Sequence, residues 1–314
     1  MILSKNEEKH IDSTLDMVFK QNINKEYEVI LIDSGSQDST LDIARRYPIK
    51  VLEIPAVEFG HGRTRNFGAR AANGEIIVFL NADATPTDEC WLGGLVDAFN
   101  DDEGIAGVYS NILPRPDCNP LRSWEILNEN VNSRQVRYIK DFNDYQRMKP
   151  REKRVFLSFN SISCAIKKDF LLKYQFKDIE FGEDLDWSKT VMEKGFKIVF
   201  EPQSAVLHSH NFYFSFTKTF KKYFDDSRIN NGLLNIWSWK NCPLLIGHVA
   251  YKILKDAVYV WNLNKGVFYK IGWLFYSPVI RTSELFGIIA GINSKRLPDR
   301  LRLSFSLVSD IKIN

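Results

Sequence analysis

The chain has 314 residues, 44% of them hydrophobic and 26% charged, and this composition excludes a disordered protein. The length suits one large domain or two moderate ones. No signal-peptide pattern is visible in the first residues, and the longest apolar stretches are too short to span a bilayer. The cysteines are far apart, which argues against a disulfide framework or a zinc site and indicates a reducing cytoplasm. They are Cys90, Cys118, Cys164 and Cys242.

Charge and aromatic residues are unevenly distributed along the chain. Residues 212–314 carry 15 Lys and Arg against 6 Asp and Glu, and they hold 19 of the 41 aromatic residues. The net charge is therefore +9 in this part and −6 in residues 1–211. A basic, aromatic-rich region predicts a membrane surface or an anionic ligand as its partner. Nucleic acid is disfavoured, because no recognisable binding motif accompanies the charge.

The first half alternates short apolar runs with helical patterns. Buried strands are predicted at 27–33, 49–54 and 75–83, and helices at 8–21, 39–47 and 63–74. This alternation indicates a parallel, doubly wound α/β sheet. The first strand, "MIL", is shorter than usual. Either the sequence starts downstream of the native start, or this strand is stunted.

The pattern changes after residue 113. We expect residues 114–155 to form a long functional loop with some helix, because they are rich in charge, Asn and Pro. A helix at 183–195 and strands at 197–202 and 205–210 are predicted to follow. After His210 the chain is predicted to be mostly helical. Its breaks are expected at Pro243, Gly266, Pro278 and Pro298.

Two predicted strands end on an acid followed by small polar residues. In "ILIDSGSQDST", Asp33 closes the strand, and the carboxyl ends of parallel strands face ligand crevices. There the Asp33 carboxylate can accept hydrogen bonds from a ribose or a base. A structural reading is a helix start, with Asp38 or Ser39 as N-cap of a helix that begins near Thr40. The two readings are compatible.

The strand "EIIVFLNADATP" places Asp83 at its end and Asn81 two residues earlier on the same face. A carboxylate there can hold Mg²⁺ or Mn²⁺ together with a substrate diphosphate. The alternative is a solvated strand end. In "VLHSHNF", His208 and His210 occupy alternate positions of a strand, and they can bind metal or donate to phosphate.

Basic residues enter a helix through a glycine-containing turn in "FGHGRTRNFGA". His61, Arg63 and Arg65, with free N–H groups at the helix start, suit a diphosphate, although an ordinary basic helix start is the alternative. A Walker loop and the G-x-G-x-x-G fingerprint are absent, which argues against a dinucleotide-dependent dehydrogenase.

Three acids open the helix predicted at residue 183. Glu183, Asp184 and Asp186 in "FGEDLDWS" can simply offset the helix dipole. Beside an exposed turn, they also supply a candidate general base.

Taken together and in their order along the chain, these sequence segments resemble family 2 glycosyltransferases of the GT-A fold. "LIDSGSQDST" is similar to the nucleotide-binding strand end, "RNFGARAANGEIIVFLNADATP" to the approach to the D-x-D metal motif, and "GEDLDW" to the E-D motif. The resemblance covers residues 2–211. "FGHGRTRNFGA", "LHSHNF" and "GINSKRLPDRLRLSFS" resemble the rhamnosyltransferase branch. The implied fold is a doubly wound, mostly parallel, Rossmann-like nucleotide-sugar-binding sheet at 1–211, with a mainly helical region at 212–314.

The resemblance also implies roles for individual residues. Asp184, preceded by Glu183, is the implied catalytic base, and Asp83 with His208 is the implied site for Mg²⁺ or Mn²⁺. The implied donor-binding residues are Asp33, Ser34, His61, Arg65, Asn66, Asn81 and Ala82. The chain departs from the family in two places. Asn81 replaces the first acid of D-x-D, and Ser4-Lys5 replaces the usual pair after the first strand.

The implied reaction is inverting transfer of L-rhamnose from dTDP-L-rhamnose to a hydroxyl of a glycan or lipid-linked oligosaccharide, in bacterial surface polysaccharide synthesis. The implied location is cytoplasmic, peripheral on the inner face of the membrane. Another UDP- or GDP-linked sugar, or an inactive glycan-binding relative suggested by Asn81, are the alternatives. A sugar nucleotidyltransferase is disfavoured, because "ILSKNEEKHI" lacks a Gly-rich loop bearing Arg and Lys.

Overall fold

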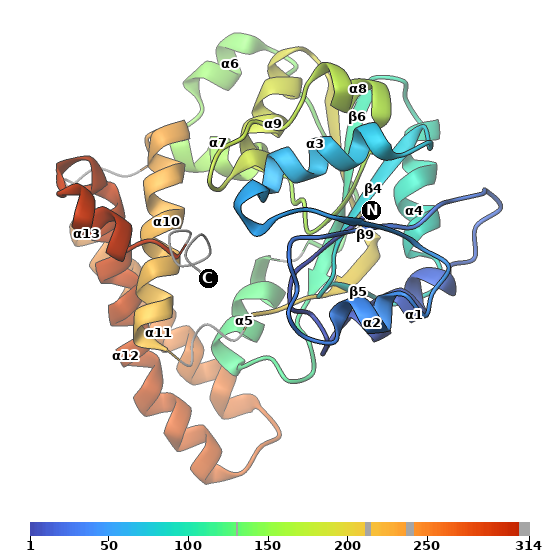
Figure 1. Cartoon of the computed structure of the whole chain (residues 1–314). Coiled ribbons are helices and arrows are strands. Elements are labelled where there is room, and N and C mark those ends of the chain that lie inside the picture. The colour runs from blue at the N-terminus through green and yellow to red at the C-terminus, as the bar shows by residue number, and fades with distance from the viewer. Residues whose placement is uncertain (130, 211–214, 237–241, 308–314) are drawn as a thin grey trace. The chain divides into compact units, whose positions relative to one another are not determined.

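The structure, a computed structural model, describes residues 1–129, 131–210, 215–236 and 242–307 (Figure 1). The chain forms two compact units. The first contains Met1–Leu113 and Asn130–His208, and the second contains Pro114–Glu129 and Ser209–Asn314. Residues 114–129, which we expected in the catalytic domain, therefore fall in the second unit.

The first unit is built on one mixed sheet with the strand order β3-β2-β1-β4-β8-β6-β9-β5, in which β7 also pairs with β9. The strands are β1 (Ile2–Ser4), β2 (Ile30–Asp33), β3 (Lys50–Glu53), β4 (Ile76–Asn81), β5 (Thr85–Pro86), β6 (Ile105–Leu113), β7 (Gln135–Arg137), β8 (Ser163–Lys167) and β9 (Lys197–Leu207). Strands β1 to β4 are mutually parallel, as the βαβ alternation predicted. The antiparallel strands β5, β7 and β8 were not predicted, and β5 and β7 are too short to show a period, with two and three residues.

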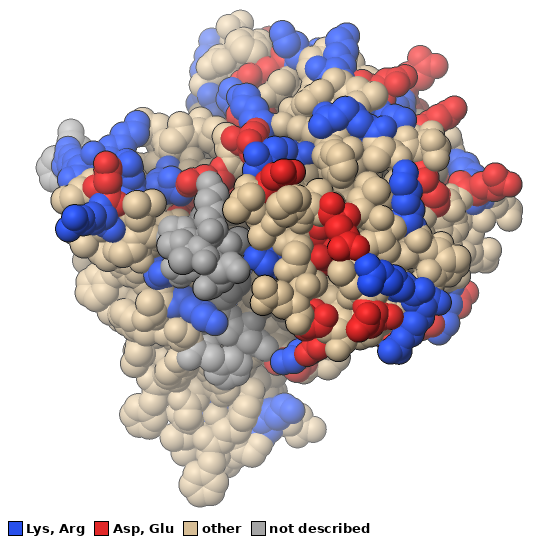
Figure 2. Space-filling model, in the orientation of Figure 1, with Lys and Arg blue, Asp and Glu red and all other residues tan. Residues whose placement is uncertain are grey.

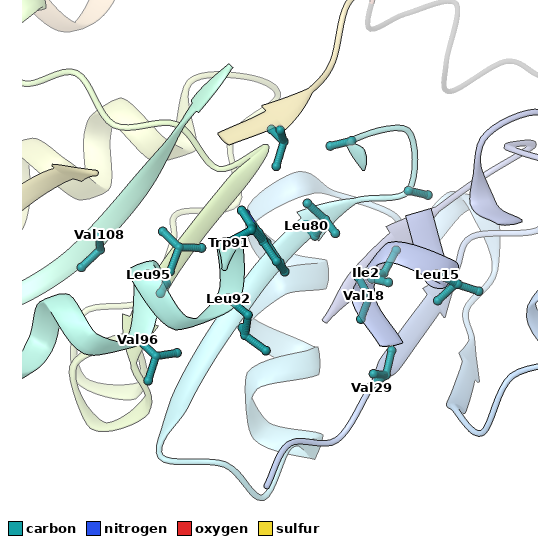
Figure 3. Close-up of a cluster of buried hydrophobic side chains, with 14 of the residues drawn as sticks. Ile2, Leu15, Val18, Val29, Leu80, Trp91, Leu92, Leu95, Val96 and Val108 are labelled. Atoms are coloured by element: carbon teal, nitrogen blue, oxygen red, sulfur yellow. The ribbon is translucent and has the colours of Figure 1, made fainter. Parts of the chain in front are cut away.

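Helices connect these strands, and a buried apolar cluster lies between them (Figure 3). The helices are α1 (Ile11–Phe19), α2 (Thr40–Ala44), α3 (His61–Ala71), α4 (Trp91–Asp97), α6 (Phe142–Arg147), α7 (Pro150–Phe156), α8 (Lys168–Lys173) and α9 (Glu183–Glu193). Every residue of β2 is buried, which explains its uninterrupted apolar run. Trp91 of α4 is anchored by its indole N–H, which donates to Ser163 Oγ over 2.9 Å.

Two sequence predictions change in the structure. Residues 114–155 contain α5, β7, α6 and α7 rather than a loop with some helix. The two strands predicted at 197–202 and 205–210 are the single strand β9. Its pairing with β6 shifts register, because Glu201 and Ala205 face the consecutive residues Ser110 and Asn111. The intervening residues form a bulge that resembles a turn in sequence.

The second unit is mainly helical, as expected. Its helices are α5 (Pro120–Glu129), α10 (Phe216–Leu234), α11 (Cys242–Asn262), α12 (Val267–Ile292) and α13 (Asp299–Ser304). Gly266 and Pro298 are N-caps, and Pro243 lies in the first turn of α11. Pro278 was predicted to break the chain, but α12 continues through it. Among the described residues, we find no helix with the length and hydropathy needed to cross a membrane.

Candidate active site

The carboxyl ends of three neighbouring parallel strands bring the predicted donor residues to one edge of the sheet. In the sheet register, Asp33 of β2 pairs with Ser4 of β1, and Asn81 of β4 pairs with Leu3 of β1. This edge is where open α/β sheets bind ligands. Ala82 follows directly, buried, with its N–H donating to Leu3 O.

Asp33 shapes the turn that follows β2. Its Oδ2 accepts hydrogen bonds from the N–H groups of Gly35 at 2.9 Å and Ser36 at 2.8 Å. Gly35 has φ +85°, a left-handed conformation that favours glycine. Ser34 donates from its N–H and Oγ to Ser4 O, which joins the ends of the two strands. The turn holds Asp33 and Ser34 in place before any ligand arrives.

The predicted helix cap after this turn comes from Asp38. Its Oδ1 accepts the N–H of Thr40, the first residue of α2, over 3.0 Å. Ser39 occupies the N-cap position without a side-chain cap bond.

Arg65 of α3 and Glu183 of α9 form a buried ion pair. Arg65 Nη1 lies 2.7 Å from Glu183 Oε1, and both side chains are almost fully buried. Arg65 also donates to His61 O and Ser161 O, and it lies 3.5 Å from Asn81 Oδ1. Ser161 Oγ donates to the same oxygen of Glu183. The guanidinium expected to contact a diphosphate is therefore held by protein acceptors.

Asp184 follows Glu183 at the head of α9 and is half-buried. Its Oδ2 lies 3.4 Å from the Ser161 N–H, and its Oδ1 accepts the N–H of Leu185. Burial, together with the neighbouring carboxylate of Glu183, raises the pKa of Asp184 to about 6. A carboxylate with this pKa is ionised at pH 7 and more basic than an ordinary Asp, which suits a general base.

Asp186 of α9 and His61 at the start of α3 differ from Asp184 in charge state or partner. Asp186 is buried and paired with Lys177, whose Nζ lies 2.9 Å from Asp186 Oδ1. His61 has its pKa lowered to about 4 by burial and by Arg65, so its imidazole is neutral at pH 7. Of the three acids in the first turn of α9, Glu183 and Asp186 form ion pairs, whereas Asp184 forms none with the described residues.

Asp83 and His208 meet beyond the ends of β4 and β9. Asp83 Oδ2 lies 3.4 Å from His208 Nε2, and both side chains are buried. The pairing of β5 with the end of β9, Thr85 opposite Leu207, brings them together. A carboxylate oxygen next to an imidazole nitrogen is a donor set found around Mn²⁺ and other divalent cations. His210, two residues further along the chain, belongs to the same group of possible ligands.

Asn66, another predicted donor residue, also has a structural task. Its amide group donates to Phe176 O at 2.7 Å and accepts from Phe176 N at 3.1 Å. These bonds tie α3 to the segment that precedes α9.

Two contributors to the site were missed by sequence reasoning. Ser161 bonds to Arg65, Glu183 and Asp184, and Lys177 pairs with Asp186. Neither residue lies in a recognisable motif, so no sequence signal marks them.

The sequence profile of glycosyl transferase family 2 matches residues 1–174, and the chain belongs to this family. Among curated relatives, the O-antigen chain rhamnosyltransferase WbaN of Salmonella anatum is 32% identical over 66% of this chain and 64% of its own length. RfbN of Salmonella typhimurium, with the same description, is 31% identical over 68% of this chain and 66% of its own length. The matches thus span just under two thirds of these relatives.

Solved structures with a similar fold cover nearly the whole chain. The mannosyltransferase PcManGT from Pyrobaculum calidifontis, solved with GDP-Man and Mn²⁺, gives a TM-score of 0.55 at 15% identity, covering 94% of this chain and 86% of that one. Staphylococcus aureus TarS 1–349 gives 0.50 at 17% identity, covering 94% and 90%. The fold is therefore the GT-A type that the motifs implied.

Proposed function

We propose that this chain is an inverting rhamnosyltransferase, moving L-rhamnose from dTDP-L-rhamnose to a hydroxyl of a glycan or lipid-linked oligosaccharide in bacterial surface polysaccharide synthesis. Family membership and the two rhamnosyltransferase relatives support this choice. The observation that carries inverting transfer is Asp184, a half-buried carboxylate of raised pKa at the head of α9.

Asp184 is the proposed general base. It takes the proton of the acceptor hydroxyl while that oxygen attacks the anomeric carbon on the face opposite the nucleotide. The new bond joins the acceptor oxygen to the anomeric carbon, and the bond to the diphosphate oxygen breaks. A single displacement inverts the centre, so a β-L donor produces an α-L-rhamnoside. The ion pair between Arg65 and Glu183 holds α9 against α3 and so positions Asp184.

The donor is proposed to bind at the strand ends. Asp33 and Ser34 are the proposed contacts of the nucleoside, and Asn81 lies at the same edge of the sheet. His61, neutral at pH 7, can donate one hydrogen bond to the diphosphate of the donor. In this assignment the main role of Arg65 is its ion pair with Glu183.

Asp83 and His208 are the proposed ligands of a divalent cation, and His210 is within reach as a further ligand because it is two residues from His208. Mixed oxygen and nitrogen donors favour Mn²⁺ over Mg²⁺, which prefers oxygen alone. When bound, the cation would neutralise charge on the leaving diphosphate.

The test is a donor screen with the full chain. Thermal shift is measured with dTDP-L-rhamnose and with UDP- and GDP-sugars, each with and without Mn²⁺, followed by turnover assays with lipid-linked acceptors. We expect dTDP-L-rhamnose to give the largest shift and to be consumed. A larger shift with a UDP- or GDP-sugar would identify a different donor. Binding of glycans without turnover of any donor would instead indicate an inactive glycan-binding relative.

We also propose a peripheral location on the cytoplasmic face of the membrane, where a lipid-linked acceptor is presented. The net charge of +9 in residues 212–314 supports this location.

A further inference from the structure

The hairpin of α11 and α12 in the second unit exposes two rows of large apolar side chains. Spacings of three, four or seven positions place each row along one face of its helix. We call these residues the hairpin stripe. They are Leu244, Tyr251, Leu254, Val258 and Trp261 of α11, and Phe268, Ile271, Phe275, Val279 and Phe286 of α12. Phe268 is 92% exposed and Phe275 is 77% exposed, values that a folded protein in water does not favour for phenylalanine.

The same hairpin turns both of its acidic residues inward. Asp256 accepts two hydrogen bonds from Arg281, at 2.8 Å each, and Glu284 accepts from Lys252 at 2.7 Å. Arg281 and Lys252 also bind Glu125 of α5, at 2.6 Å each. Burial alone would raise the pKa of Glu125, but these two cations hold it well below its usual range. The acids of the hairpin are thus neutralised inside the second unit.

The exposed charges of the hairpin are consequently all positive. Lys255 and Lys265 are exposed, and Lys270 is partly exposed with its Nζ donating to Trp261 O. Asp256 and Glu284 are the acids of residues 242–292 in the sequence. In Figure 2 the free end of the hairpin, at the bottom of the view, shows tan and blue atoms and no red ones.

We propose that the hairpin stripe docks on an anionic phospholipid surface. An apolar helix face flanked by lysines is the pattern of helices that lie in the headgroup region. Trp261 and Tyr251 of the stripe suit the boundary between water and hydrocarbon. A second copy of the chain fits less well, because a twofold contact would bring the same lysines together. This surface specifies the membrane contact of the proposed function, but it does not depend on the donor or the reaction.

The first experiment is co-sedimentation of the full chain with vesicles of phosphatidylcholine alone or mixed equally with phosphatidylglycerol. We expect binding to the mixed vesicles that weakens in high salt. The double variant Phe268→Ser/Phe275→Ser should bind about tenfold or more weakly, because two aromatic side chains no longer enter the lipid. The matched control is Val57→Ser/Val155→Ser, which removes apolar side chains that are 84% and 71% exposed in the first unit. The control should bind as the wild type does.

A charge variant tests the lysines beside the hairpin stripe. Lys255→Glu/Lys265→Glu should lose about tenfold or more in binding to phosphatidylglycerol vesicles, because lysines near an anionic surface each favour binding. Its control, Lys173→Glu/Lys194→Glu, changes two exposed lysines of the first unit by the same charge and should have little effect.

Two results would overturn the proposal. One is wild-type protein that ignores the mixed vesicles at low salt. The other is a wild-type dimer, seen by sedimentation velocity, that the phenylalanine variant converts to monomer without any change in vesicle binding. The thermal shift with dTDP-L-rhamnose should persist in the variants. A loss of vesicle binding is therefore distinguishable from a failure of the proposed function.

Discussion

Arg65 Nη1 and Glu183 Oε1 lie 2.7 Å apart although the two residues are 118 positions apart in the chain. Their ion pair connects α3 to the first turn of α9, and the next residue is Asp184. A buried pair of this kind contributes little net stability over an apolar pair, but removing one partner leaves an uncompensated charge. Its evident value here is positional, because it fixes the end of the helix that carries the proposed base.

Arg65→Met should lower the free energy of unfolding by about 3–5 kcal/mol, because Glu183 is left charged and buried. The double variant Arg65→Met/Glu183→Gln should recover part of this loss. Urea unfolding measures both. The exposed pair of Arg45 and Glu53, at 2.8 Å, provides the control, and Arg45→Met should cost less than about 1 kcal/mol. Equal effects of the two single variants would contradict a special role for the buried pair.

Asp184→Asn should lower kcat by about 10² or more, since an amide cannot accept the acceptor proton. Donor affinity should change little. Asp186→Asn is the matched control, because it makes the same substitution two positions along α9, at a carboxylate that is ion-paired with Lys177. Steady-state kinetics of both variants check the assignment, and an inactive Asp186→Asn beside an active Asp184→Asn would reverse it.

The raised pKa of Asp184 predicts two opposite pH effects. Activity should fall as the pH drops below about 6, because the base becomes protonated. Stability should move the other way, since the folded state binds this proton more tightly than the unfolded state. The favourable contribution of this proton to the free energy of unfolding is complete below the unfolded-state pKa near 3.8. It is lost as the pH rises through the folded-state pKa of about 6. Asp184→Asn should therefore raise Tm above pH 6 and have little effect below pH 4. An unchanged Tm difference across this range would contradict the shift.

Asp83→Ala should weaken donor binding in Mn²⁺ and have little effect in EDTA, because the carboxylate is proposed to act through the cation. His208→Gln should reproduce this pattern, given the 3.4 Å separation of the two side chains. Isothermal titration with Mn²⁺, before any donor is added, gives a readout independent of activity. Full wild-type activity in EDTA would exclude the metal role.

Gly291→Ala should destabilise the second unit by about 1–3 kcal/mol, the usual cost of overpacking. A Cβ at this position would lie 2.4 Å from Phe224 O of α10, so the two helices would have to separate. Gly272→Ala, in the same helix with nothing within 4 Å, should be neutral or stabilising by about 0.5–1 kcal/mol. Thermal unfolding of the two variants gives the comparison, and equal destabilisation would contradict the packing argument.

Features set by neighbouring residues were predictable from the sequence. The buried strand that ends at Asp33, the acidic first turn of α9 and the helical character of the described residues after 215 all follow from local runs of apolar, polar and glycine residues. The order of the motifs was enough to indicate the glycosyltransferase family. Local patterns carry this information because burial on one side of a helix or strand repeats with a fixed period.

Only the tertiary structure decided which charges meet. The pairing of Arg65 with Glu183, the approach of His208 to Asp83 and the inward turn of Asp256 join distant segments, and no spacing in the sequence encodes these contacts. The tertiary structure likewise showed that the two strands predicted at 197–202 and 205–210 are the single bulged strand β9. Sequence periodicity reports whether a side chain is buried, whereas its partner depends on how separate elements pack. The candidate residues and their implied roles were therefore visible in the sequence, whereas the partner that each buried charge meets was not.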